Sequence, residues 1–106
     1  MVSFEDFKNI DIRVAEIIEA KEHPNADKLY VLTVNVGDET KQIVAGIRVS
    51  YTVDELKGKK VIVINNIEPA VLRGEESRGM LLAASSENGP ILVVPEKEAS
   101  VGSKVK

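Results

Sequence analysis

The chain has 106 residues, of which 43% are hydrophobic, 4% aromatic and 29% charged, with a formal net charge of −3 and no cysteine. This length suits one domain, and the scarcity of aromatic residues leaves its core to valine, isoleucine and leucine, which favours β-structure. The lack of cysteine excludes disulfides and thiolate metal sites, and no apolar run approaches the roughly 20 residues of a membrane helix. We therefore expect a soluble cytoplasmic protein. Its acidic balance argues against a broadly basic nucleic-acid-binding surface but leaves room for a local basic patch.

The first elements are predicted from capping and alternation. Ser3 and Asp6 have the spacing of a variant capping box, which predicts a short helix over residues 3–8. Residues 11–20 alternate between apolar and polar side chains and change face once, as a strand with a bulge does. Residues 23–27 contain proline, asparagine and aspartate, which predict a turn.

An antiparallel pair of strands follows this turn. Residues 29–36 alternate, and residues 37–39 predict a hairpin turn that leads into a third strand at residues 40–47. One face of the second strand is the more apolar and is expected to point inward. This face contains Tyr30, Leu32, Val34 and Val36.

The β-pattern continues after one interruption. Residues 50–57 break the alternation and are expected to contain a short helix closed by a glycine. The apolar run at residues 60–67 predicts a central strand. Residues 69–79 are polar and contain glycine, so we expect a loop there, followed by strands at residues 79–84 and 91–94.

These elements match an all-β OB-fold, a five-stranded Greek-key barrel with a short helix between strands 3 and 4, a short N-terminal helix and a C-terminal extension. Residues 1–106 are expected to form a single domain with its core at about 11–85. We expect the N- and C-terminal extensions, through Phe4, Phe7 and the stretch from Ile91 onward, to lie at a dimer interface, because exposed apolar residues at a barrel edge seek cover.

Catalysis and metal binding receive no support from the sequence. His23 is the only histidine, there is no cysteine, and no pair of acids has the spacing of an acid–base couple. Beside Pro24 in a turn, His23 is expected to be a solvated or hydrogen-bonding loop residue. We therefore expect no enzymatic activity from this chain by itself, no metal and no cofactor.

Two polar segments that lead from a loop into a strand contain the candidate binding residues. They cover residues 23–29 and 72–80. In the second segment, Gly74 and Gly79 would let a ligand approach the backbone, and the arginines offer planar donors for phosphate. Considered alone, the second segment is equally well interpreted as a surface loop whose arginines pair with the neighbouring glutamates.

Together with two further motifs, these segments resemble the tRNA-binding domain family found at the C-terminus of methionyl-tRNA synthetases, in free-standing tRNA-binding proteins and in a cytokine-related synthetase cofactor. The matching residues occur in the family's order at positions 11–14, 23–30, 43–47, 72–74 and 76–85. The resemblance implies an OB barrel that grips the outer corner of tRNA by shape and phosphates, usually as a dimer, because double-helical RNA exposes few readable base edges.

By matching position, the resemblance implies six RNA-binding residues, Asn25, Lys28, Arg73, Ser77, Arg78 and Met80. The three cations are expected at phosphates, and the amide and hydroxyl groups at sugar or phosphate oxygens. The methionine is expected to touch a sugar or base, although a place in the core fits it about equally well.

Two positions depart from the family pattern. Ala15 stands where the family often has glycine, and Glu75 where it often has an apolar residue. A carboxylate beside the RNA contacts would weaken binding, unless Glu75 points away and forms a salt bridge.

The expected function is non-catalytic, largely sequence-independent binding of tRNA, as the accessory C-terminal domain or beta subunit of methionyl-tRNA synthetase, a methionine–tRNA ligase. The expected partners are tRNA, a second copy of the chain in a homodimer and the catalytic part of the synthetase, with no membrane. The alternative is an export-chaperone-like OB-fold dimer that holds unfolded polypeptide and would need an exposed apolar groove. The cation-bearing segments favour RNA.

Overall fold

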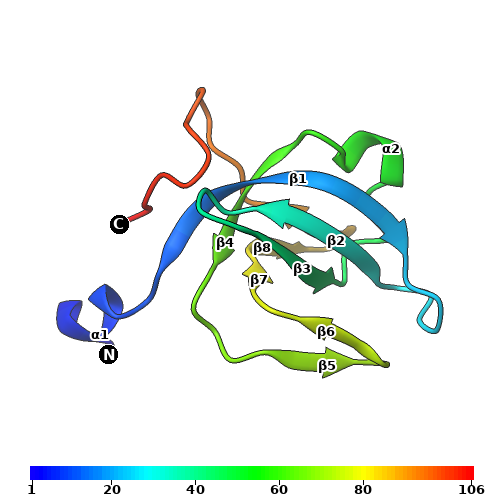
Figure 1. Ribbon diagram of the computed structural model, residues 1–106, viewed down its shortest axis with the longest axis horizontal. Helices are drawn as coiled ribbons and strands as arrows, with labels where there is room; N and C mark the ends of the chain where they lie inside the picture. The colour runs from blue at the N-terminus through cyan, green and yellow to red at the C-terminus, as the bar shows by residue number, and fades with distance from the viewer.

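The computed structural model describes residues 1–106 and has the all-β, OB-fold-like architecture expected from the sequence (Figure 1). Its main sheet has five antiparallel strands in the order β3-β2-β1-β4-β7. These strands are β1 (Ile12–Glu22), β2 (Tyr30–Asn35), β3 (Thr40–Ala45), β4 (Lys60–Ile64) and β7 (Met80–Leu81).

Strand β1 organises the barrel because it changes partners along its length. Its first half pairs with β4 and its second half with β2, and the register with β2 shifts between Ile17 and Glu19, which confirms the predicted bulge. The C-terminal tail covers the other side of the first half. The Val14 amide donates to the Ser103 carbonyl oxygen at 2.9 Å, and the Gly102 amide donates to the Val14 carbonyl oxygen at 2.7 Å. The tail thus covers backbone that would otherwise be an exposed strand edge.

The core is aliphatic, and the predicted inward face of β2 is confirmed. Tyr30, Leu32, Val34 and Val36 are all buried within one cluster of side chains. Leu56 of helix α2 (Val53–Leu56) joins that cluster.

Both predicted helices are present and begin at side-chain caps. Helix α2 begins with a complete capping box between Thr52 and Glu55. Helix α1 (Phe4–Lys8) lies outside the barrel, where the Ser3 hydroxyl accepts a hydrogen bond from the Asp6 amide at 3.1 Å. Neither helix is long and apolar enough to cross a membrane.

The prediction of a loop at residues 69–79 is wrong, because a β-hairpin occupies most of this segment. Strands β5 (Ala70–Leu72) and β6 (Glu75–Ser77) pair with each other. Their two-residue turn has positive φ at both positions, 54° at Arg73 and 93° at Gly74. Such a turn matches the twist of the flanking strands, but an arginine in the left-handed region has no clear sequence signal.

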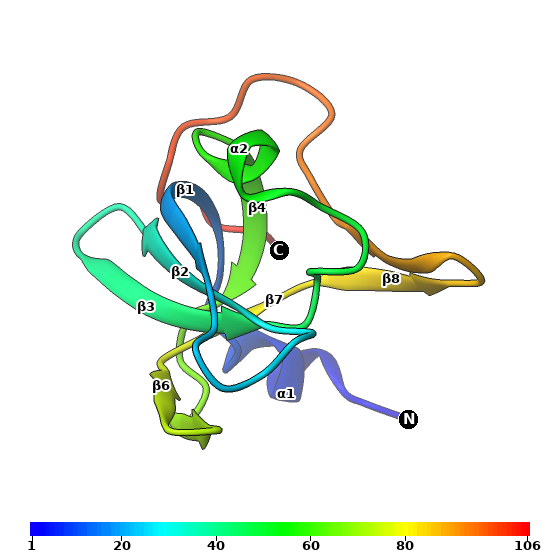
Figure 2. The same ribbon diagram turned by 90° about the vertical axis from the view of Figure 1, so that its right-hand side faces the viewer.

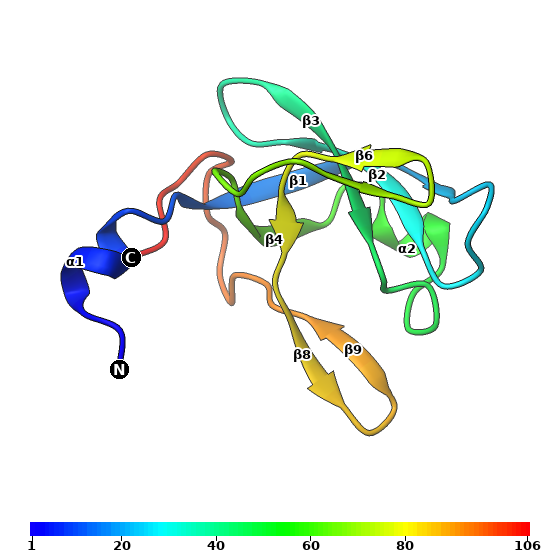
Figure 3. The same ribbon diagram turned by 90° about the horizontal axis from the view of Figure 1, so that it is seen from below.

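The predicted strand at residues 79–84 is divided in two. Its first part, β7, stays in the barrel, whereas β8 (Ala83–Ser86) leaves it and pairs with β9 (Gly89–Leu92). The predicted sixth strand therefore begins two residues early, at Gly89. Figure 3 shows that the β8–β9 hairpin projects away from the barrel.

Candidate nucleic-acid interface

The loop between β1 and β2 lies beside the turn of the β5–β6 hairpin. The Nη2 atom of Arg73 donates a hydrogen bond to the Asn25 carbonyl oxygen at 3.1 Å. Around this contact is a surface hollow of about 400 Å³, here called the cation hollow, which is lined by Asn25, Ala26, Asp27, Lys28, Leu29 and Arg73. The structure therefore brings together three of the six predicted binding residues, Asn25, Lys28 and Arg73.

The predicted cations have no carboxylate partners. Lys28, Arg73 and Arg78 are exposed, and none of them forms an ion pair. The arginines therefore do not pair with the neighbouring glutamates, as the alternative interpretation of this segment as a surface loop had required. The cation hollow does contain one acid, Asp27, which is also exposed. The net charge of the side chains that line the hollow is positive, and its two cations are available to bind an anionic ligand.

Glu75, the acidic departure from the family pattern, lies beside a neutral partner. Its Oε1 atom is 3.4 Å from Nε2 of Gln42, and the residue is half-buried. The salt bridge to lysine or arginine, one of the two alternatives for this residue, is therefore not formed. Glu75 also does not line the cation hollow.

Arg78 lies at the base of the hairpin, away from the cation hollow. Its amide donates to the Gln42 carbonyl oxygen at 2.9 Å, which anchors its backbone to β3 while the residue remains exposed. It lies five positions after Arg73 at the hairpin turn, so the two arginines are roughly 15 Å apart along the hairpin at the usual strand rise. The interface thus has two points of positive charge rather than one cluster.

Ser77 is buried, in contrast to the surface contact expected of it. Its hydroxyl accepts a hydrogen bond from the Val44 amide at 3.0 Å and donates one to the Gly79 carbonyl oxygen at 3.0 Å. The first of these bonds attaches β6 to β3, and Figure 2 shows the two strands next to each other. Ser77 therefore anchors the β5–β6 hairpin to the barrel, and we do not retain it among the residues that face a ligand.

Met80 is partly exposed beside two shallow apolar hollows. These hollows measure about 180 and 140 Å³, and both are lined by Met80 and Val44. With 42% of its surface exposed, the methionine is not a core residue. Its thioether side chain can contact a sugar or a base at the surface.

His23 is a structural part of the interface that the sequence did not reveal. Only 4% of its surface is exposed, so the expectation of a solvated residue is wrong, whereas the expectation of a hydrogen-bonding residue is confirmed. Its Nε2 atom lies 2.9 Å from the Leu72 carbonyl oxygen, and its Nδ1 atom lies 2.9 Å from the Asn25 amide nitrogen. The imidazole therefore joins the loop to the hairpin.

Arg48 supports the same loop from its other side. Its guanidinium forms an ion pair with Glu22 at 3.1 Å and donates to the Ala26 carbonyl oxygen at 3.3 Å. It also lies over the ring of Tyr30, 5.8 Å from the centroid. Because its charge is already paired, we assign Arg48 to the support of the loop rather than to ligand contact.

A second charged cluster ties the chain ends to the barrel. Asp11 pairs with Arg13 at 2.9 Å and with Lys104 of the tail at 3.0 Å, while Arg13 also pairs with Asp38 at 2.9 Å. The hydrogen bond from Arg13, with further bonds from Asn65 and Lys104, holds the pKa of the Asp11 carboxyl well below its usual range. The same pairing raises the pKa of Arg13. The charges of this cluster are paired with one another and stabilise the fold.

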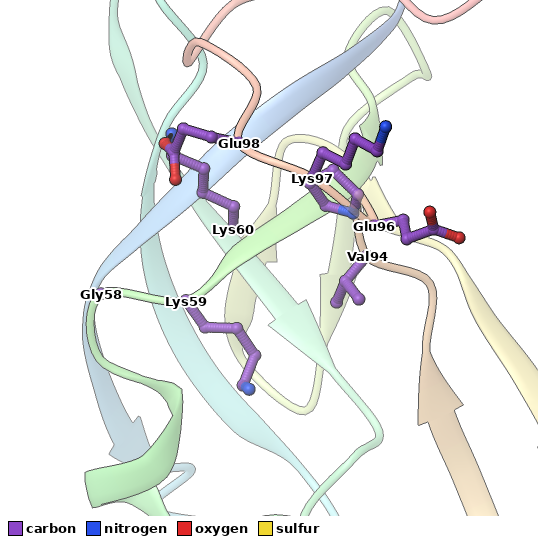
Figure 4. Close-up of a pocket in the computed structure, with 8 residues that line it drawn as sticks. Gly58, Lys59, Lys60, Val94, Glu96, Lys97 and Glu98 are labelled. Atoms are coloured by element: carbon purple, nitrogen blue, oxygen red, sulfur yellow. Dashed lines mark hydrogen bonds and ion pairs between the residues drawn. The ribbon is translucent and has the colours of Figure 1, made fainter.

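A hollow of similar size lies near the start of β4, and Figure 4 shows that its cations do not converge. Lys60 is paired with Glu98 and donates to the Ala99 carbonyl oxygen at 2.6 Å, whereas Lys59 and Lys97 point apart. This hollow is a weaker candidate for phosphate than the cation hollow. No group of three or more His, Cys, Asp or Glu side chains is placed to hold a metal ion.

Comparison with known proteins agrees with these observations. Residues 12–104 match the family described as "Putative tRNA binding domain". The chain is 50% identical over 105 residues to the methionine–tRNA ligase of Pyrococcus horikoshii, an alignment that covers 99% of this chain and 14% of that relative. The chain thus spans about one-seventh of the length of the curated relatives it matches first.

Solved structures with the same architecture include the following two. One is a MetRS related protein from Pyrococcus horikoshii, with a TM-score of 0.92, 33% identity and coverage of 100% of this chain and 98% of that chain. Another is a CsaA chaperone protein from Picrophilus torridus, with a TM-score of 0.93, 33% identity and full coverage of both chains. The family match includes every residue of the cation hollow. The chain belongs to the tRNA-binding domain family.

Proposed function

We propose that the chain binds tRNA without catalysing a reaction, through phosphates and shape and with little reading of sequence. The observation that carries this proposal is the set of three exposed cations without carboxylate partners, Lys28, Arg73 and Arg78, on a loop and a hairpin that are tied together. Phosphate contacts dominate the affinity of proteins for nucleic acids, and double-helical RNA presents mainly its backbone and 2′-hydroxyls.

The separation of the cations suits a folded RNA. Lys28 and Arg73 share the cation hollow, whereas Arg78 lies at the other end of the hairpin. A ligand with phosphates on a bent surface, such as the corner of tRNA, can reach both points at once. In this arrangement Asn25 contacts sugar or phosphate oxygens and Met80 makes an apolar contact beside Arg78.

The chain serves as an accessory part of a cytoplasmic methionyl-tRNA synthetase under this proposal. The ligase relatives are about seven times longer than the aligned segment, which supports a role for the segment as an attached module. A second point of attachment raises the local concentration of tRNA at the catalytic part and adds affinity without adding chemistry.

The same proposal includes a homodimer. Phe4, Phe7, Ile10 and Val105 line a hollow of about 510 Å³ beside helix α1. The β8–β9 hairpin and the chain that follows it expose Ile91, Val93 and Val94. Apolar side chains on elements that project from the barrel are the kind of surface that a second copy covers.

Binding of unfolded polypeptide is the second candidate function. The similarity to a CsaA chaperone protein and the apolar hollows on both sides of Met80 favour it. These hollows are small, however, and a peptide-holding surface has no need of cations without partners. We therefore prefer RNA.

A titration with two ligands separates these functions. Wild-type protein and the Arg73→Ala/Arg78→Ala variant are titrated with total tRNA and with a reduced, unfolded polypeptide at the same ionic strength. We expect tRNA to bind the wild type, to bind the variant about tenfold or more weakly, and to resist displacement by polypeptide. Preferential binding of polypeptide, unchanged in the variant, would support the chaperone-like function instead.

A further inference from the structure

The hydrogen bonds of His23 define the state of its imidazole ring. The Asn25 amide can only donate, so the Nδ1 atom, 2.9 Å away, must accept. The Leu72 carbonyl oxygen can only accept, so the Nε2 atom, also 2.9 Å away, must carry the hydrogen and donate. A single neutral tautomer therefore satisfies both partners of a side chain that is almost fully buried.

Together with the Arg73 contact, these two hydrogen bonds form a closed network of hydrogen-bonded residues. Leu72 directly precedes Arg73, and Arg73 donates from its guanidinium to the carbonyl oxygen of Asn25. Asn25 thus gives its amide hydrogen to His23 and accepts at its carbonyl oxygen from Arg73. His23 holds the backbone at both ends of the contact between loop and hairpin.

The hairpin turn has little else to hold it. Strands β5 and β6 pair only with each other, and a two-stranded hairpin alone is at best marginally stable. Its strands are anchored to β3 by Ser77, by Arg78 and by Gln42, whose Nε2 atom donates to the Glu76 carbonyl oxygen at 2.9 Å and to Glu75 Oε1 at 3.4 Å, but none of these bonds reaches the turn residues Arg73 and Gly74. Without the His23 bond, the exposed Arg73 contact is the remaining side-chain hydrogen bond between the turn and the loop.

We propose that His23 is a positioning residue for RNA binding, which acts by holding the Arg73 guanidinium beside Lys28 before the ligand arrives. The inference rests on the proposed tRNA binding and adds to it a residue that touches no RNA. A phosphate that meets a preformed pair of cations does not have to order the hairpin turn, so less of the binding free energy is lost to entropy.

Two conservative variants test the two hydrogen bonds of the His23 side chain separately. In His23→Gln, the side-chain amide extends to about the position of Nε2 and can donate to the Leu72 carbonyl oxygen. In His23→Asn, the shorter side chain keeps an acceptor near Nδ1 for the Asn25 amide but does not reach Leu72. The first variant retains the link to the hairpin, and the second retains only the local turn.

The experiment measures tRNA affinity over a salt series for wild type, Arg73→Ala, His23→Asn, His23→Gln and His23→Asn/Arg73→Ala. All variants are assayed well below their midpoints of thermal unfolding. We expect Arg73→Ala and His23→Asn each to weaken binding about 3- to 10-fold and to reduce the magnitude of the salt slope by about one. The double variant should bind no more weakly than Arg73→Ala, and His23→Gln should stay within about twofold of wild type.

The salt slope distinguishes positioning from general support of the fold, because loss of stability alone leaves the number of phosphate contacts unchanged. If Arg73→Ala weakens binding while His23→Asn matches wild type, or if the two effects add in the double variant, the role of His23 is refuted and the tRNA proposal stands. If Arg73→Ala changes neither affinity nor slope, the proposed RNA interface fails, and the inference with it. Should His23→Asn not fold, a folded His23→Gln variant that loses as much affinity as Arg73→Ala would overturn the inference, and wild-type affinity would support it.

Discussion

The guanidinium of Arg73 and the backbone carbonyl of Asn25 are joined by a hydrogen bond of 3.1 Å across 48 positions of the chain. This bond connects the hairpin turn to the β1–β2 loop and brings Arg73 into the same hollow as Lys28. The candidate interface is thus assembled from two separate segments, which His23, Arg48 and Ser77 hold in place.

Replacement of Ser77 by alanine is expected to lower stability while leaving RNA binding unchanged. The substitution removes the acceptor of the buried Val44 amide, which costs about 1–3 kcal/mol of unfolding free energy. Urea unfolding measures this loss, and tRNA titration at a temperature where the variant is folded measures affinity. A variant as stable as wild type that binds tRNA poorly would instead place Ser77 at the RNA.

Gly79 is expected to be sensitive to substitution. A Cβ atom at this position would lie 3.0 Å from Cδ1 of Ile43 and 3.2 Å from the Ile64 carbonyl oxygen, so Gly79→Ala requires both neighbours to shift by a few tenths of an ångström. We expect a loss of about 1–3 kcal/mol in unfolding free energy. The matched control is Gly46→Ala, whose Cβ would meet only the Leu29 side chain at 3.7 Å and which should be nearly neutral. Equal stability of the two variants would contradict the close packing.

The Asp11 cluster predicts how stability depends on pH. Because folding lowers the pKa of Asp11, the carboxylate stabilises the native state above its unfolded pKa of about 4, and this contribution is lost as the pH falls toward the folded pKa. Asp11→Asn should therefore lower unfolding free energy by about 1–2 kcal/mol at pH 7 and flatten its decline below pH 4. Urea unfolding at pH 7, 5, 4 and 3 measures both effects. If unfolding free energy declines below pH 4 as steeply in Asp11→Asn as in wild type, the Asp11 cluster does not contribute to the pH dependence of stability.

The proposed homodimer can be tested at its apolar surface. We expect the wild type to sediment at twice the chain mass of 11.6 kDa, and Phe4→Glu/Ile91→Glu to sediment as a monomer, because buried charges at an interface are not solvated. Val71→Glu, at an exposed position on the β5–β6 hairpin, is the control and should remain a dimer. A monomeric wild type at micromolar concentration would contradict the proposal.

The regular parts of the fold were predictable because their signals are local. Alternation identified β1 and β2, the hairpin turn identified β3, and the apolar run identified β4. The change of face identified the bulge near Ile17, and the Ser3 cap identified α1. The β5–β6 hairpin was not predictable in this way, because its turn requires a positive φ at Arg73, which arginine seldom adopts.

The site was predictable only in part, because burial depends on contacts between distant segments. Lys28 and Arg73 were placed together through the family resemblance, and no feature of either segment alone required it. Ser77 and His23 both belong to polar segments, yet each becomes buried when a partner from 33 or 49 positions away packs against it. A polar residue in a loop therefore does not indicate by itself whether it faces a ligand or holds the loop in place.

The most direct test of the tRNA interface is filter binding of total tRNA over a salt series, with wild type, Arg73→Ala/Arg78→Ala and Lys59→Ala/Lys97→Ala compared. The last variant removes two lysines that line the hollow at the start of β4, the half-buried Lys59 and the exposed Lys97, and matches the change in net charge. We predict that affinity falls steeply with salt for wild type and the lysine variant, and that the slope of the arginine variant is smaller in magnitude by about two. Equal slopes and affinities for all three proteins, or a larger loss in the lysine variant, would contradict an interface built on the loop and the hairpin.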